Sequence, residues 1–245
     1  MTDYLNPYNA YQDTAVAKAS DVERATFIRR TYAHLLGAIL AFVALETLAF
    51  TLTSEHTRMQ MVRTLMGNRM TWLLVLGGFI FVSWIADRWA KSATSLGMQY
   101  AGLGLYVAAE ALLFAPMLFL ADMFVPGAIG TAAIITLVVF GGLTAFVFST
   151  RSDFSGWGKY LAMAAFGALG AVVLGAIFPT TFTLGPIFSA LMIMLAAGYI
   201  LYDTSNIMHH YNTNQYVAAS LALFASVALL FWYVLRIVIE LSGRD

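Results

Sequence analysis

Long apolar runs alternate with short polar segments along the whole chain. The runs are bounded by charged residues, proline or turn residues, and cover roughly residues 32–53, 71–90, 97–121, 127–149, 158–178, 184–208 and 215–239. An α-helix rises about 1.5 Å per residue, so about 20 apolar residues cross the hydrocarbon core of a bilayer. The pattern therefore predicts an all-α polytopic membrane protein with seven transmembrane helices.

The polar segments set the expected domain organisation. Residues 1–31 are polar and of mixed charge, and they lack the apolar core and cleavage site of a signal peptide. Connections are short elsewhere except over residues 54–70, where apolar residues among three arginines predict a short interfacial helix. We expect a polar N-terminal tail over 1–31 and a single transmembrane domain over 32–245.

Composition supports this fold class and excludes several functions. The chain is 60% hydrophobic and 11% charged, whereas soluble domains are about 45–50% apolar and about 25% charged. Its net charge of zero offers no basic surface for nucleic acid. The absence of cysteine excludes disulfides, thiol chemistry and cysteine-ligated metals. The first expected partner is thus the lipid bilayer.

The distribution of lysine and arginine favours a cytoplasmic N-terminus. With that orientation, the inner flanks contain more basic residues than the outer flanks, and Arg29 and Arg30 directly precede the first run. The inner set is Lys18, Arg24, Arg29, Arg30, Arg88, Lys91, Arg151 and Lys159, and the outer set is Arg58, Arg63, Arg69, Arg236 and Arg244. The short loops suit a bacterial inner membrane, and the endoplasmic reticulum is the alternative.

Few charged residues interrupt the apolar runs. Each costs about 2.5–3.5 kcal/mol at the centre of a membrane helix, so each is a functional candidate. Glu46 lies in the first run and Glu110 in the third; either could instead form a structural interhelical hydrogen bond. Arg88 ends the second run, either as an interfacial anchor or as the counter-ion of a buried carboxylate.

Asp203 in the sixth run is the most informative of these residues. Tyr199, Asn206 and His210 are spaced from it by three or four residues, so the four form one polar stripe on a helix. A carboxylate in this setting can change its charge with pH; the alternative is a hydrogen-bonded carboxyl that only fixes helix register. His209 and His210 point in different directions, so no metal site is expected.

The motifs of several membrane enzymes and receptors are missing. No lysine lies in the sixth or seventh run to form a retinal Schiff base, and no Gly-x-Ser-Gly, H-E-x-x-H or Walker lysine motif occurs. We find no catalytic constellation and no cofactor motif, and we expect no enzymatic activity.

Four segments resemble the Bax inhibitor-1 family of membrane proteins. Residues 144–155 read TAFVFSTRSDFS, 110–116 read EALLFAP, 199–204 read YILYDT and 231–236 read FWYVLR. The second is similar to the glutamate-containing third helix of the family, and the third to its tyrosine-aspartate-threonine signature. Their order and spacing carry the resemblance over most of the chain from about residue 100.

The resemblance implies a fold, an activity and a site. The family fold encloses the seventh helix within the other six, and the family is linked to pH-sensitive calcium leak and, in eukaryotes, to protection from cell death. Its pH sensor pairs an aspartate of the sixth helix, matched by Asp203, with a second aspartate on the seventh. No acid stands there in this chain, where Phe224 or Ser226 takes its place. An arginine on the second helix completes the sensor, and Arg88 is the candidate.

These observations lead to two principal hypotheses. The first is a cation leak channel with Ca²⁺ as the permeant ion, gated by protonation around Asp203, with Glu110 and Glu46 along the route. The second is a non-channel protein that binds and regulates other membrane proteins in stress or quality control. A proton-coupled transporter is a third reading, but it usually contains internal repeats, and we see none.

Overall fold

Seven long helices and one short helix dominate the structure. The computed structural model describes residues 15–92, 95–178 and 184–242. The elements are η3 (Val16–Lys18), α1 (Asp21–Leu52), α2 (Glu55–Met66), α3 (Arg69–Ala90), α4 (Leu96–Phe124), α5 (Ala128–Thr150), η4 (Ser155–Trp157), α6 (Gly158–Ile177), α7 (Pro186–His209) and α8 (Tyr216–Ser242). All of the helices except α2 and the two short 3₁₀ turns are long and apolar enough to cross a membrane, which confirms the seven predicted spans.

The first helix starts earlier than the apolar pattern indicated. It begins at Asp21, not near residue 32, because Ser20 and Glu23 form a capping box. The Ser20 hydroxyl accepts the Glu23 N–H at 3.3 Å, and the Glu23 carboxylate accepts the Ser20 N–H at 3.0 Å. The apolar run marks only the part of a helix that meets lipid, whereas a cap marks where the helix begins.

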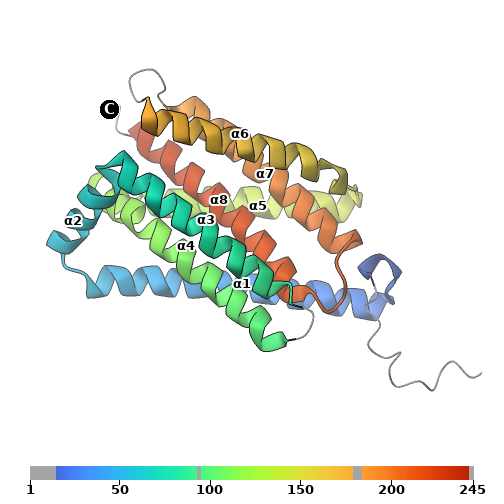
Figure 1. The fold of residues 1–245 in the computed structure, drawn as a ribbon. Helices are drawn as coiled ribbons and strands as arrows, with labels where there is room; N and C mark the ends of the chain where they lie inside the picture. The colour runs from blue at the N-terminus through green and yellow to red at the C-terminus, as the bar shows by residue number, and fades with distance from the viewer. Residues whose placement is uncertain (1–14, 93–94, 179–183, 243–245) are drawn as a thin grey trace, which may run out of the picture.

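The last helix, α8, lies in the middle of the bundle (Figure 1). It packs against α1, α3, α4, α5 and α7, and rings from three helices meet beside it. The Phe114 ring lies 4.9 Å from Trp232 and 5.2 Å from Phe42, both in edge-to-face contact. The central seventh span is thus confirmed, with α6 at the periphery against α7 and α3.

Helices α3 and α4 approach closely because Gly102 has no side chain. A Cβ atom at this position would lie 2.5 Å from both the Ala86 carbonyl oxygen and the Ala90 nitrogen. Ala86 and Ala90 are themselves buried on the facing side of α3. Small residues at such contacts are typical of helix packing in lipid, where van der Waals contact replaces the hydrophobic effect.

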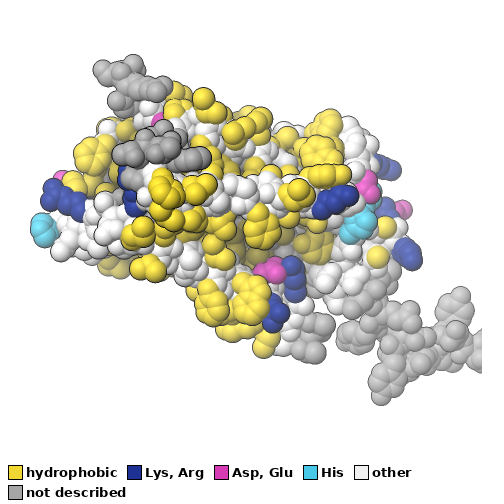
Figure 2. Space-filling view, turned by 45° about the horizontal axis from the view of Figure 1, so that its top comes forward, with side chains coloured by type: hydrophobic (Ala, Val, Ile, Leu, Met, Phe, Trp, Pro, Cys, Tyr) yellow, Lys and Arg dark blue, Asp and Glu magenta, His cyan; other side chains and the backbone are white. Residues whose placement is uncertain are grey.

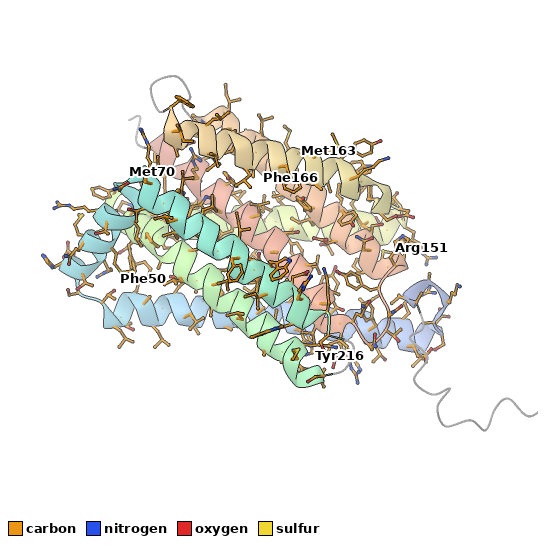
Figure 3. The ribbon with its side chains drawn as sticks, viewed as in Figure 1. Phe50, Met70, Arg151, Met163, Phe166 and Tyr216 are labelled. Carbon is orange, nitrogen blue, oxygen red and sulfur yellow. The ribbon has the colours of Figure 1, made fainter. Side chains whose placement is uncertain are left out.

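The outer surface suits a lipid environment. Apolar side chains cover much of the visible face, and most charged side chains lie toward its ends (Figure 2). Phe166 and Met163 project from α6 and are 75% and 70% exposed (Figure 3). The short helix α2 lies at one end, where Arg58 forms an ion pair with Asp122 of α4 at 3.5 Å. The sequence of residues 54–70 predicted a short helix here.

Candidate functional site

Asp203 of α7 forms a buried pair with Ser226 of α8. The Ser226 hydroxyl donates a hydrogen bond of 2.5 Å to Asp203 Oδ2, and the two residues are 5% and 7% exposed, respectively. Of the two residues considered for the missing second acid, the structure therefore places Ser226 beside Asp203. Phe224 packs its ring against Phe42 and Tyr106 instead.

Antiparallel packing of α7 and α8 brings these two side chains together. The two helices are joined by a short turn, and both lie against each other along their length. Ala218 and Ala219 of α8 are almost completely buried, and such small residues allow close approach of neighbouring helices.

Several phenol groups and one ammonium group surround Asp203. Groups from four other segments interact electrostatically with it: Tyr32 of α1, Tyr106 of α4, Tyr211 of the α7–α8 turn and Lys91 at the end of α3, together with Tyr199 of its own helix. The hydroxyl of Tyr32 also interacts with those of Thr144 and Thr204. None of the three completes a hydrogen bond of good geometry within the described residues. Asp203 is thus within electrostatic range of polar groups from five segments.

Arg88 does not face Asp203. Its guanidinium lies 4.2 Å above the Trp84 ring and its side chain is exposed, so the counter-ion expected from the sequence is not formed. The reason is helical geometry: the buried face of α3 contains Ala86 and Ala90, and Arg88 is about 200° away from each of them at about 100° per residue. Lys91 interacts electrostatically with Asp203 and pairs with Asp87 at 2.8 Å.

A cavity of about 800 Å³ reaches this pair from the other end of the bundle. It is lined by residues of α3, α4, α6, α7 and α8, among them Tyr106, Glu110, Tyr199 and Ser226. Glu110 is 5% exposed and interacts with the hydroxyl of Tyr106, one turn earlier in α4. The structure therefore brings Glu110 and Ser226 to one cavity, and Asp203 lies directly behind Ser226.

Glu46 is separate from this cavity. It is 6% exposed on the inner face of α1, one turn from Phe42 and Phe50, which contact Phe114 and Phe119 of α4. Neither of its carboxyl oxygens has a hydrogen-bond partner among the described residues. The structure thus buries Glu46 as predicted but does not place it with Asp203 and Glu110.

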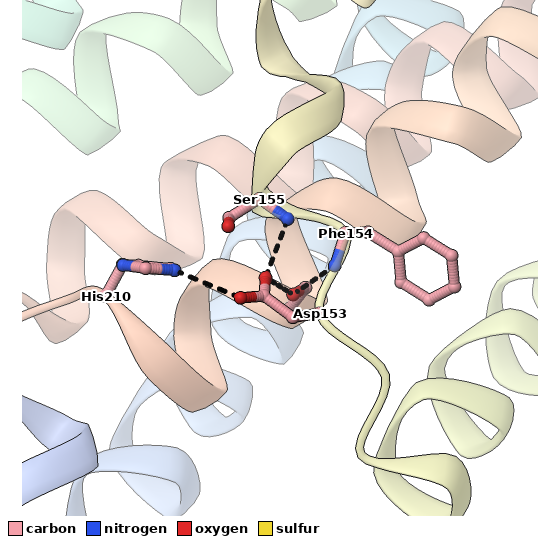
Figure 4. A network of polar contacts seen from close by, with 5 residues as sticks. Asp153, Phe154, Ser155 and His210 are labelled. Carbon is pink, nitrogen blue, oxygen red and sulfur yellow. Dashed lines mark hydrogen bonds and ion pairs between the residues drawn. The ribbon is translucent and has the colours of Figure 1, made fainter.

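The other three residues of the predicted polar stripe lie in different surroundings. Tyr199 reaches the cavity, whereas the Asn206 carbonyl accepts the His210 and Tyr211 N–H groups where the helix ends. His210 Nε2 lies 3.8 Å from Asp153 Oδ2 in the α5–α6 loop (Figure 4). The stripe is therefore not one surface.

Asp153 and Ser205 anchor the α5–α6 loop to α7, which sequence reasoning missed. Ser205 Oγ donates to Asp153 Oδ1 at 3.1 Å and accepts the Phe154 N–H at 2.9 Å (Figure 4). Asp153 Oδ1 also accepts the Ser155 N–H at 2.9 Å. These bonds, with those to Ser155 the largest cause, lower the pKa of Asp153 to about 2. The Asp-x-Ser spacing is typical of an Asx turn and was the available signal.

The chemistry of the site is that of a carboxyl group and its hydroxyl neighbours. Among the residues that the structure describes, no three His, Cys, Asp or Glu side chains come close enough together to hold a metal ion. The arrangement can bind or release a proton at Asp203 and offer oxygen atoms to a cation along the cavity.

Comparison with known proteins gives a consistent result. The sequence profile of a family described as inhibitor of apoptosis-promoting Bax1 matches residues 24–244. Bax inhibitor 1 of Schizosaccharomyces pombe is 28% identical over 95% of this chain and 83% of that protein. Protein lifeguard 4 of Mus musculus is 27% identical over 96% of this chain and 95% of that protein. Golgi anti-apoptotic protein of Vaccinia virus strain Lister is 30% identical over 46% of this chain and 47% of its own length.

Proposed function

The chain belongs to the Bax inhibitor-1 family, and from this premise we propose that it is a pH-sensitive cation leak channel with Ca²⁺ as the permeant ion. The observation that carries the proposal is the buried Asp203–Ser226 pair at the inner end of a cavity that also exposes Glu110. A buried ionisable residue within a membrane span is costly, and such residues commonly lie on ion or proton pathways.

Protonation of Asp203 would change the contact between α7 and α8. A charged carboxylate accepts hydrogen bonds only, whereas the protonated form also donates one. A proton that binds at Oδ2 would require the Ser226 hydroxyl to change from donor to acceptor in this hydrogen bond. Because α7 and α8 meet at this pair, a change there alters the barrier between the cavity and the opposite end of the bundle.

The serine at position 226 simplifies the expected pH response. Two carboxylates that share a proton titrate in two coupled steps, but Asp203 pairs with a hydroxyl that does not titrate in the physiological range. We therefore expect a single-site dependence of the flux on pH.

Calcium uptake into proteoliposomes tests this function. Purified wild-type protein, Asp203→Asn and the control Asp21→Asn would be reconstituted with a fluorescent calcium indicator inside, and flux recorded from mildly acidic to neutral pH. Asp21 is an exposed carboxylate at the start of α1, so its neutralisation should leave the flux unchanged. We expect Asp203→Asn to remove the dependence on pH; a pH profile identical to the wild type would exclude gating at Asp203.

The alternative is a protein that regulates other membrane proteins without conducting ions. The replacement of the second acid by Ser226 favours it, because the paired carboxylates of the family's sensor are incomplete here. A partner that co-purifies in stoichiometric amount, together with no flux at any pH, would support this reading over the channel.

The protein is an integral membrane protein, and we further propose a bacterial inner membrane with the N-terminus in the cytoplasm. The basic residues that flank the spans support this orientation. Because the chain has no cysteine, a single Ser20→Cys variant can be labelled with a membrane-impermeant maleimide. Labelling in intact cells would contradict the orientation. The proposal assigns no catalytic activity and no cofactor.

A further inference from the structure

The cavity that reaches Ser226 is open on one side of the bundle. Its walls come from the first half of α3, the last turns of α6 and the second half of α8, together with α4 behind them. Figure 1 shows α8 in view between α3 and α6, at the end where α3 begins and α6 and α8 end. In a bilayer this flank faces lipid chains, because all three helices are long enough to span it.

Small side chains on α6 leave this flank open. The α6 residues that line the cavity are Val172, Gly175 and Ala176. The larger side chains of the same helix, Met163 and Phe166, are mostly exposed and do not line it (Figure 3). Small side chains at these positions leave more room for a ligand than Met163 or Phe166 would.

The walls of the cavity are mostly apolar. Leu76 and Phe79 of α3 and Leu113 and Met117 of α4 are among the lining residues. The few polar groups at its inner end are already engaged, since Ser226 bonds to Asp203 and Glu110 interacts with Tyr106. The inner end needs no polar group from a ligand, so a hydrocarbon chain fits it. A volume of about 800 Å³ lies within the usual range for ligand sites, about 300–1,000 Å³.

Among the described residues, the charged side chains at the mouth of the cavity are Arg69, Arg236 and Glu240, which together have a net charge of +1. Arg236 donates to Glu240 Oε1 at 2.9 Å and to the Leu184 carbonyl, and Glu240 also accepts the Ser189 hydroxyl at 3.1 Å. Arg236 and Glu240 thus neutralise each other. Arg69 lines the same mouth and forms no ion pair or hydrogen bond within the described part of the chain, so its charge is available to a ligand.

Two stacked indoles lie beside these charges. The Trp72 and Trp232 rings are 5.7 Å apart and inclined by 15°, and both line the cavity. Tryptophan is enriched at the level of lipid headgroups, where one side of the ring meets hydrocarbon and the other meets polar groups. Along the cavity, the charge of Arg69 is followed by the Trp72–Trp232 pair and then by the apolar interior. A phospholipid has its headgroup, glycerol region and acyl chain in the same order.

We propose that this cavity binds an anionic phospholipid of the surrounding bilayer, with one acyl chain between α3, α6 and α8 and the headgroup at Arg69. A lipid in this cavity would close the proposed ion route while it is bound, and its binding does not depend on whether the protein conducts. The charge of Arg69 selects an anionic headgroup over a zwitterionic one, and the open flank leaves the second acyl chain in the bilayer.

Tryptophan quenching by brominated lipids tests the site directly. Of the five tryptophans, Trp84, Trp89 and Trp157 would be replaced by phenylalanine, so that emission reports on Trp72 and Trp232. The protein would be reconstituted into phosphatidylcholine vesicles with increasing amounts of brominated phosphatidylglycerol, or with brominated phosphatidylcholine instead. We expect quenching by the anionic lipid to saturate at a mole fraction about fivefold lower, the effect of one basic residue at an anionic lipid.

Matched variants distinguish a site from a general surface charge. Arg69→Gln should remove most of the preference for phosphatidylglycerol, whereas Arg63→Gln, an exposed arginine of α2 outside the cavity, should preserve it. Ala176→Phe should weaken quenching by both lipids because it fills the cavity. Equal quenching by the two lipids in the parent protein, or equal effects of the two arginine variants, would overturn the proposal; neither result requires calcium flux.

Discussion

Two aspartates of this protein each bind a serine of a neighbouring segment, and they differ in almost everything else. Asp203 and Ser226 join α7 to α8 over 2.5 Å and are 7% and 5% exposed. Asp153 and Ser205 join the α5–α6 loop to α7 over 3.1 Å, and the Asp153 side chain is 56% exposed. The same chemical pair thus occurs once inside the bundle and once at its end.

The comparison shows how burial decides what such a pair can do. Water can replace the serine at Asp153, and hydrogen bonds to Ser155 and Ser205 with the charge of His210 hold the Asp153 pKa at about 2. That carboxylate remains charged over the whole physiological range and holds a loop in place. Asp203 is buried and accepts a hydrogen bond from Ser226, so its proton, its charge and the position of Ser226 are coupled.

The largest difference between the pairs should appear when the serines are removed. Ser226→Ala leaves a buried carboxyl oxygen without its partner, so we expect the free energy of unfolding in detergent to fall by about 1–3 kcal/mol. Ser220→Ala is the matched control, because Ser220 is equally buried in α8 but donates to the Val217 carbonyl of its own helix. If both variants lose the same stability, the Asp203 contact contributes nothing of its own.

Ser205→Ala should have a smaller effect, confined to the α5–α6 loop. The variant removes the acceptor of the Phe154 N–H and the donor to Asp153. We expect the free energy of unfolding to fall by about 1 kcal/mol, because polar groups of the loop can form hydrogen bonds with water instead. Amide hydrogen exchange at Phe154 should accelerate. Ser149→Ala is the control, because the Ser149 hydroxyl donates only to the Phe146 carbonyl within α5; it should leave the exchange at Phe154 unchanged. If Ser205→Ala also leaves that exchange unchanged, other contacts hold the loop.

The smallest expected effect is the loss of stability at Asp153 in acid. The Asp153 pKa in the folded protein is about 2, below its ordinary value of 3.8. The carboxylate therefore stabilises the fold above about pH 4, and this contribution is lost as the pH falls toward 2. Because the group is exposed, we expect at most about 1 kcal/mol. Asp153→Asn should be less stable than wild type at pH 6 and equal to it near pH 2; a constant difference would locate the effect elsewhere.

The apolar pattern predicted the fold because every helix that crosses a bilayer must be long enough to span its hydrocarbon core. Seven runs of about 20 residues became seven spanning helices with ends within a few residues of those expected. The start of α1 was missed, because Ser20 and Glu23 cap it outside the apolar run. The Bax inhibitor-1 resemblance, carried by short motifs, is confirmed over residues 24–244.

The site was predicted residue by residue but not as a set of contacts. The cost of a charge in lipid marked Glu46, Glu110 and Asp203 correctly as unusual, and all three are buried. Helical spacing alone could not show that Glu46 lies apart from the cavity, or that Arg88 turns away to Trp84. A period of 3.6 residues tells which side chains share a face, but not which neighbour that face meets.

The sequence by itself thus determined that the protein is a bundle of seven membrane helices and which few ionisable groups lie within it, because hydrocarbon penalises every unpaired charge wherever the helices pack. Only the tertiary structure decided which of the two residues, Phe224 or Ser226, contacts Asp203. It is Ser226, because the packing of α8 against α7 places its hydroxyl on Asp203 and directs Phe224 into an aromatic contact with α1 and α4. The cavity beside them could also be seen only in the tertiary structure, because it forms between α3, α6 and α8 and its lining comes from several helices.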